Sequence, residues 1–148
     1  MAASVALTAA AEGAARERMR DLRDRAVALR GEAVGLAGLD TESYRRVLEA
    51  GGPDEAGAAL SQAADPPLAI AELAAELAEL AAEAARSGNP RLRGDAFTAA
   101  LLAEAACRAA SELVTIDLAD IPRDPRHERS RRASARGWSA REQARSGA

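Results

Sequence analysis

LAIAELAAELAELAAEAARS (residues 68–87) and AFTAALLAEAACRAASELV (residues 96–114) are the two segments that decide the fold of this chain. Both consist mainly of Ala, Leu and Glu, which have high helix propensity and lose little side-chain entropy in a helix. Elsewhere β-branched residues are scarce, and no segment alternates between apolar and polar residues over a useful length. The sequence therefore predicts an all-α protein.

The segment between them, GNPRLRGD (residues 88–95), interrupts the helical pattern. Gly88 is a good helix terminator, Asn89 is a good capping residue, and Pro90 suits the first position of a helix. These features predict a turn between two helices. They leave open whether the polar residues of the turn also belong to a site, namely Asn89, Arg91, Arg93 and Asp95.

Hydrophobic periodicity and helix-breaking residues predict an antiparallel bundle of about five Ala-rich helices in residues 1–122. Ala and Leu supply almost all the apolar mass, because the chain has only three aromatic residues. We therefore expect a thin core of closely apposed helices. The last expected helix is apolar on two sides, and a second apolar side needs a partner, so we also expect a homodimer. The expected helices cover residues 2–38, 39–50, 54–63, 66–87 and 95–118.

Charge is unevenly distributed along the chain. Residues 1–122 contain 12 Arg and 20 acidic residues, a net charge of −8, whereas residues 123–148 contain 8 Arg and 3 acidic residues, a net charge of +5. The acidic body argues against nucleic-acid binding. Residues 123–148 have few apolar residues and no periodicity, so we expect a disordered, Arg-rich tail. Such a tail either solubilises the protein or contacts an anionic surface.

Common catalytic and metal-binding patterns are absent from the sequence. Cys107 is the single cysteine, which excludes an internal disulfide and a cysteine-cluster metal site, and His127 is the single histidine. There is no Gly-rich phosphate loop, HExxH pair or GxSxG elbow. Since neither a signal peptide nor a membrane-spanning run is recognisable, we expect a cytoplasmic protein with no membrane partner.

Two carboxylates beside predicted helix ends remain as candidates for chemistry. Asp40, or its neighbour Thr41, could cap the helix of residues 39–50, and Asp95 could cap the helix that follows the turn. In an Ala- and Leu-rich environment either carboxyl group could instead have a raised pKa and act as a general acid or base. Tyr44 lies one helical turn after Asp40, and the spacing of Asp95 on its helix allows an inward orientation.

Three stretches, in this order, resemble the cyclodeaminase/cyclohydrolase family. LDTESYRRVLEA (residues 39–50) is similar to the family segment D-x-x-A-[FY]-x-x-V. DPPLAIAELAAELAELAAEAARSGNPRLRGD (residues 65–95) is similar to VPLxIAExAxExLELAxxxAxxGNPNAxSD. AFTAALLAEAACRAASELVTIDL (residues 96–118) is similar to GVAALLAxAAxxGAxxNVxINL. The resemblance covers nearly all of residues 3–121.

The resemblance implies an all-helical, usually homodimeric enzyme that acts on one-carbon units of tetrahydrofolate. Its members are formimidoyltetrahydrofolate cyclodeaminases, which release ammonia, or methenyltetrahydrofolate cyclohydrolases. A tetrahydrofolate derivative would be the substrate, and no tightly bound cofactor is expected. GNPRLRGD would then be a turn at the mouth of a folate pocket. The implied acid/base or pterin-contacting residues are Asp40 and Asp95, and the implied substrate-binding residues are Tyr44, Asn89, Arg91 and Arg93.

The sequence also departs from the family pattern. Met1 begins after the family's Pro-Gly-Gly-Gly-Ser element, and AAAEGA (residues 9–14) replaces its basic G-K-K-K-Y segment. Arg91 and Gly94 replace the Asn and Ser of the family turn, and its two late asparagines are Glu112 and Asp117 here. Three interpretations follow: a folate enzyme, a non-catalytic helical dimer that keeps the scaffold, or an accessory chain completed by a partner.

Overall fold

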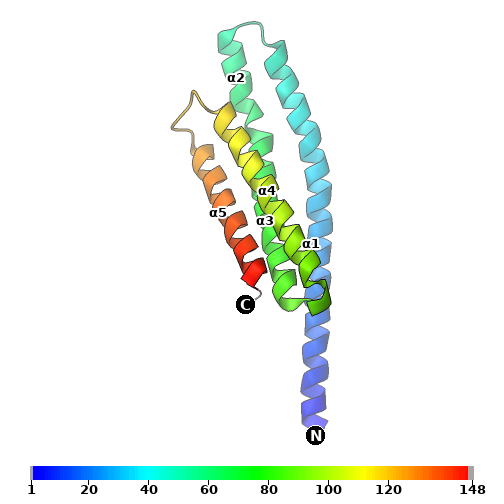
Figure 1. Cartoon of the computed structure of the whole chain (residues 1–148). Coiled ribbons are helices and arrows are strands. Elements are labelled where there is room, and N and C mark those ends of the chain that lie inside the picture. Colours follow the sequence, from blue (N-terminus) through cyan, green and yellow to red (C-terminus); the bar gives the residue numbers. More distant parts are fainter. Residues whose placement is uncertain (1, 147–148) are drawn as a thin grey trace.

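The computed structural model describes residues 2–146, with side chains from Glu12 onward, and these residues form helices and connecting turns without a strand (Figure 1). The all-α prediction is confirmed. The elements are α1 (Ala2–Glu49), α2 (Pro53–Ala63), α3 (Asp65–Ser87), the short 3₁₀ helix η1 (Pro90–Leu92), α4 (Arg93–Asp117) and α5 (Pro125–Ser146).

Helix α3 lies at the centre of the bundle and contacts α1, α4 and α5. The chain runs up α1, down through α2 and α3, up α4 and down α5 (Figure 1). At 1.5 Å per residue α1 is about 72 Å long and α3 about 35 Å. The N-terminal part of α1 therefore extends beyond the end of the bundle.

The boundary predicted between residues 38 and 39 is wrong, because α1 continues through it without a break. Consequently four α-helices, rather than about five, cover the described part of residues 1–122. The inward side of α1 explains the continuity, since side chains at three- and four-residue steps face the bundle on both sides of the expected break. These half-buried or buried residues are Met19, Leu22, Ala26, Leu29, Ala33, Leu36, Asp40, Ser43 and Val47.

Alanine forms most of the buried core, as the composition predicts. Leu68 at the start of α3 is buried, whereas Leu73 and Leu77 are only half-buried and lie at the edges of the alanine seam. Because Ala projects one methyl group, the helix backbones can approach each other closely. The buried seam comprises Ala71, Ala74, Ala75, Ala78, Ala81, Ala82 and Ala85 of α3 with Ala100, Ala103, Cys107, Ala110 and Val114 of α4.

The predicted disordered tail is wrong for residues 125–146, which form α5 and pack against α3 and α4. The buried residues of α5 are separated by steps of three and four, as in a coiled-coil seam. All of them are small, which is why the segment has no conventional hydrophobic periodicity. They are Ser130, Ala133, Gly137, Ala140 and Ala144.

Arginine–glutamate pairs hold α1 and α5 against the acidic side of α3. From α5, Arg129 binds Glu72 at 2.9 Å and Arg136 binds Glu79 at 2.8 Å. Both pairs have a sequence separation of 57 residues, so α5 runs parallel to α3 in a heptad register. From α1, the corresponding pairs are Arg25–Glu76 and Arg18–Glu83. The Arg-rich segment thus neutralises part of the acidic body.

In the part of the chain that the structure describes, no helix is both long enough and apolar enough to cross a bilayer.

Candidate functional site

Asp40 of α1 and Asp117, the last residue of α4, are half-buried carboxylates, and they are close enough for the charge of Asp40 to act on Asp117. Burial raises the pKa of Asp117 above its ordinary value, and the negative charge of Asp40 raises it further. A carboxyl group with a raised pKa can hold a proton closer to neutral pH and deliver it as a general acid. Asp40 therefore does not cap a helix, since it lies within α1 on the side facing the bundle.

A cleft of about 560 Å³ opens beside this part of α1, between α1, α2 and the start of α3. Its volume falls in the range of about 300–1,000 Å³ that is typical of small-molecule sites. The cleft has both apolar surface and hydrogen-bonding groups. It is lined by Leu36, Leu39, Glu42, Ser43, Arg46, Ala59, Gln62, Asp65, Pro66 and Ala69, and we call it the α1–α2–α3 cleft.

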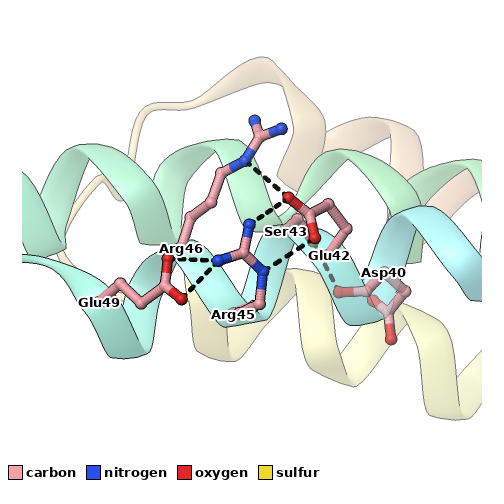
Figure 2. A network of polar contacts seen from close by, with 6 residues as sticks. All are labelled: Asp40, Glu42, Ser43, Arg45, Arg46 and Glu49. Atoms are coloured by element: carbon pink, nitrogen blue, oxygen red, sulfur yellow. Dashed lines mark hydrogen bonds and ion pairs between the residues drawn. The ribbon is translucent and has the colours of Figure 1, made fainter.

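Figure 2 shows how Ser43 connects the lining of the α1–α2–α3 cleft to Asp40. The Ser43 hydroxyl donates a hydrogen bond to the carbonyl oxygen of Asp40 at 2.9 Å. Among the described residues, the carboxylate of Asp40 has no hydrogen-bond or ion-pair partner, and Asp40 lies beside the cleft, next to its lining residues Leu39 and Ser43. Tyr44 is 54% exposed and follows one turn later on the same helix.

Ion pairs fix the charged residues on the adjacent face of α1. Arg45 donates to Glu42 at 2.7 Å and also pairs with Glu49, while Arg46 lies 3.6 Å from Glu42 (Figure 2). The hydrogen bond from Arg45 is the main cause of the lowered pKa of Glu42. Glu42 is therefore suited to accept hydrogen bonds as a carboxylate and unsuited to donate a proton near neutral pH.

Arg126 of α5 anchors the far wall of the α1–α2–α3 cleft. Its guanidinium group lies 2.7 Å from Asp65 and 2.8 Å from Asp124, and it donates to the carbonyl oxygen of Ser61 at 2.6 Å. Hydrogen bonds from Arg126 lower the pKa of Asp124 to about 2. The segment expected to be disordered thus helps to position α2 and the first turn of α3 around the cleft.

The turn between α3 and α4 has the local structure that the sequence predicts. Gly88 follows α3, and the Asn89 side chain accepts a hydrogen bond from the backbone N–H of Arg91 at 3.0 Å. Arg93 donates to the carbonyl oxygen of Arg145 at 3.3 Å and so contacts the end of α5. Asp95 is exposed in the first turn of α4, so the inward orientation that its spacing allows is not adopted.

The structure does not bring the two predicted catalytic carboxylates together within one chain. Asp95 lies in the first turn of α4, and Asp117, the neighbour of Asp40, is its last residue. Twenty-two residues of helix separate them, a distance of about 33 Å. The predicted site residues therefore form two groups, with Asp40 and Tyr44 at one end of the bundle. The other group contains Asn89, Arg91, Arg93 and Asp95.

Asp117 is the candidate acid/base residue that the sequence did not single out. It is visible there only as a carboxylate in place of a late family asparagine. The structure adds that burial and the nearby charge of Asp40 raise the pKa of Asp117, which is what makes it a candidate acid. Among the described residues, no group of three or more His, Cys, Asp or Glu side chains could hold a metal ion.

Among the comparisons with known proteins, a family model matches the chain. The family model for formiminotransferase-cyclodeaminase matches residues 1–136, which include α1 to α4 and the first half of α5. No curated protein and no solved structure matches the chain. Since the family model covers most of the 148 residues, the resemblance described from the three sequence stretches is confirmed. The chain belongs to the formiminotransferase-cyclodeaminase family.

Proposed function

We propose that this protein is a cytoplasmic enzyme that interconverts one-carbon units of tetrahydrofolate, as a methenyltetrahydrofolate cyclohydrolase or a formimidoyltetrahydrofolate cyclodeaminase. The observation that carries the proposal is the half-buried Asp40–Asp117 pair beside a cleft of about 560 Å³. Family membership supplies the substrate class. The folate derivative is the substrate, and the reaction uses no tightly bound cofactor.

Both reactions require proton transfer close to the bridging carbon of the folate. In the cyclohydrolase reaction, water adds to the methenyl carbon and loses a proton, one carbon–nitrogen bond breaks, and the released nitrogen carries a proton. In the cyclodeaminase reaction, a folate amine attacks the formimidoyl carbon and loses its proton, and the departing nitrogen is protonated and leaves as ammonia. Asp117, with its raised pKa, suits the acid role, and Asp40 suits the base role.

The substrate-binding roles divide between the two ends of the bundle. Tyr44 is exposed next to Asp40 and offers an aromatic face to the pterin. Asn89, Arg91 and Arg93 lie about 33 Å away and cannot contact the same folate within one chain. We propose that they contact a folate bound to a second copy, with Asp95 beside them, in a homodimer.

Exposed apolar side chains on α1 and α4 support the homodimer. Val27, Val34 and Leu48 of α1 are spaced by multiples of seven residues, as in a coiled-coil stripe. On α4, Leu102 and Ile116 are 68% and 65% exposed. A two-fold interface uses the same patch on both copies, so an antiparallel arrangement would bring the Asp95 end of one chain to the Asp40 end of the other.

The alternative function is a non-catalytic helical dimer that keeps the family scaffold for binding or assembly. The separation of Asp40 from Asp95 within the chain favours it, as does the pairing of Glu42 with Arg45 and Arg46 on the cleft wall. This alternative predicts a stable dimer without folate affinity, whereas the enzyme requires both properties.

Calorimetric titration with 5-formyltetrahydrofolate, followed by turnover assays, tests the proposal. We expect saturable binding to the wild-type protein and a decrease in kcat of about 10²–10⁴-fold for Asp40→Asn and for Asp117→Asn. Asp120→Asn is the matched control, because Asp120 is exposed in the turn after α4. Absence of folate binding by the wild type contradicts the enzyme proposal and supports the scaffold alternative.

A further inference from the structure

A second cleft, of about 600 Å³, lies at the opposite end of the bundle, where α1 passes the end of α3. We call it the arginine cleft. Arg20 in its lining is 22 residues before Glu42 on the same helix, so the two clefts are about 33 Å apart. Within one chain the arginine cleft is therefore separate from the Asp40 end, and it shares Asn89 with the residues proposed above to contact a folate on a second copy. It is lined by Glu12, Ala15, Arg16, Met19, Arg20, Arg23, Ser87, Gly88 and Asn89.

Three arginines of α1 converge on this cleft from consecutive turns. Arg16 pairs with Glu12 at 3.3 Å, and Arg23 pairs with its neighbour Asp24 at 2.7 Å. Arg20, which lies between them, has no ion-pair partner among the described residues. Like charges three or four residues apart destabilise a helix, so the repulsion between these arginines lowers the stability of α1 in the unliganded protein. An anion bound between the arginines would relieve that repulsion.

The opposite wall of the cleft adds hydrogen-bond donors. The Asn89 amide oxygen is already used by the backbone N–H of Arg91, which leaves the amide nitrogen as the group that can donate to a ligand. Ser87 supplies a hydroxyl group on the same wall. Met19 and Ala15 provide an apolar base between the charged groups.

We propose that the arginine cleft binds a small polyvalent oxyanion that carries carboxylate or phosphate groups. Guanidinium groups bind both chemistries through paired hydrogen bonds, and three arginines within two turns favour a ligand with more than one negative charge. Among the described residues, no hydrogen bond joins these three arginines to the carbonyl groups at the end of α3, so capping of α3 does not account for their position.

Isothermal titration calorimetry of the full chain with citrate and with pyrophosphate, at constant ionic strength, tests the proposal. Direct binding is preferable to a melting temperature, because polyvalent anions also stabilise proteins through exclusion from their surfaces. We expect saturable binding that weakens about tenfold or more in Arg20→Gln, the loss of one charge-assisted contact. Which of the two probes binds distinguishes carboxylate from phosphate recognition.

Two further variants make the test specific. Asn89→Asp keeps an oxygen that can cap η1 but replaces the amide donor with a negative charge, so anion binding should be lost while circular dichroism stays unchanged. Arg30→Gln is the matched control, because Arg30 is an exposed arginine of α1 outside both clefts. Absence of saturable heat with both probes, or equal weakening by Arg20→Gln and Arg30→Gln, overturns the proposal. The Asp40–Asp117 end is tested separately, through the effects of Asp40→Asn and Asp117→Asn on folate turnover, so failure of the anion site and failure of the proposed function are distinguishable.

Discussion

At the scale of single residues, Asp117 makes the stability of the fold depend on pH. Its pKa is raised above 3.8, so the folded state binds more protons than the unfolded state in the interval above that value. The stability that the raised pKa of Asp117 contributes to the folded state is thus fully present below about pH 3.8. It is lost as the pH rises through the raised pKa, because the folded state must then hold a partly buried negative charge. Asp117→Asn should be more stable than the wild type at pH 7, and this advantage should disappear below pH 3.8.

Urea unfolding of Asp117→Asn and of the wild type at the two pH values measures this difference. Asp120→Asn serves as the control, since its side chain is exposed in both states. An advantage of Asp117→Asn that is the same at both pH values would contradict the assignment to the Asp117 charge.

The surroundings of Gly137 and Gly88 predict opposite effects of substitution by Ala on stability. A methyl group added at Gly137 of α5 would lie 3.5 Å from the Cys107 side chain, an ordinary contact distance. Gly137→Ala should therefore gain helix propensity and stabilise the protein by about 0.5–1 kcal/mol. At Gly88 the added methyl group would lie 2.4 Å from the carbonyl oxygen of Ala84, so Gly88→Ala should be destabilised. Thermal unfolding of both variants measures the two signs, and stabilisation by Gly88→Ala would contradict the turn geometry.

At the scale of secondary-structure elements, α5 depends on a seam of small residues. Ala140 is buried in that seam, and a leucine there would force α5 away from α3 and α4. Overpacking of this kind costs about 1–3 kcal/mol. Ala140→Leu should therefore increase amide hydrogen exchange in residues 125–146, with smaller changes in α3 and α4. Ser139→Leu is the control, because Ser139 is exposed. Equal hydrogen exchange in the two variants would contradict the claim that a seam of small residues holds α5 in place.

The same elements show what the sequence could predict. α3, its terminating turn and α4 follow from propensity and capping, because Gly88, Asn89 and Pro90 act within their own segment. α5 could not be recognised in this way, since its buried positions carry Ser, Ala and Gly and its arginines find their partners on α3. The continuity of α1 was hidden by residues that often cap helices, among them Asp40, which is instead a half-buried residue within α1.

At the scale of the whole molecule, the position of the candidate residues is decided by long-range packing. The prediction of Asp40 as a functional carboxylate came from one short segment, whereas Asp117, whose pKa the charge of Asp40 raises, lies three helices later at the end of α4. Asp95 and Asn89 fall at the opposite end of the bundle because α4 is straight and about 37 Å long. Local patterns identify such residues but do not determine which of them meet.

The last prediction concerns the exposed apolar stripe of α4. If Leu102 and Ile116 pack against a second copy, replacing both with Gln should convert a dimer to a monomer without loss of helix content, since neither contributes to the buried core. Burying two such side chains on each copy is worth several kcal/mol in total, at about 1.5–3 kcal/mol per side chain. Light scattering coupled to size exclusion reports the mass directly. Trp138→Gln is the control, because Trp138 is a large apolar side chain that is 52% exposed on α5, outside α1 and α4. A monomeric wild type would contradict the homodimer and, with it, the proposed contact of Asp95 with a folate on the partner chain.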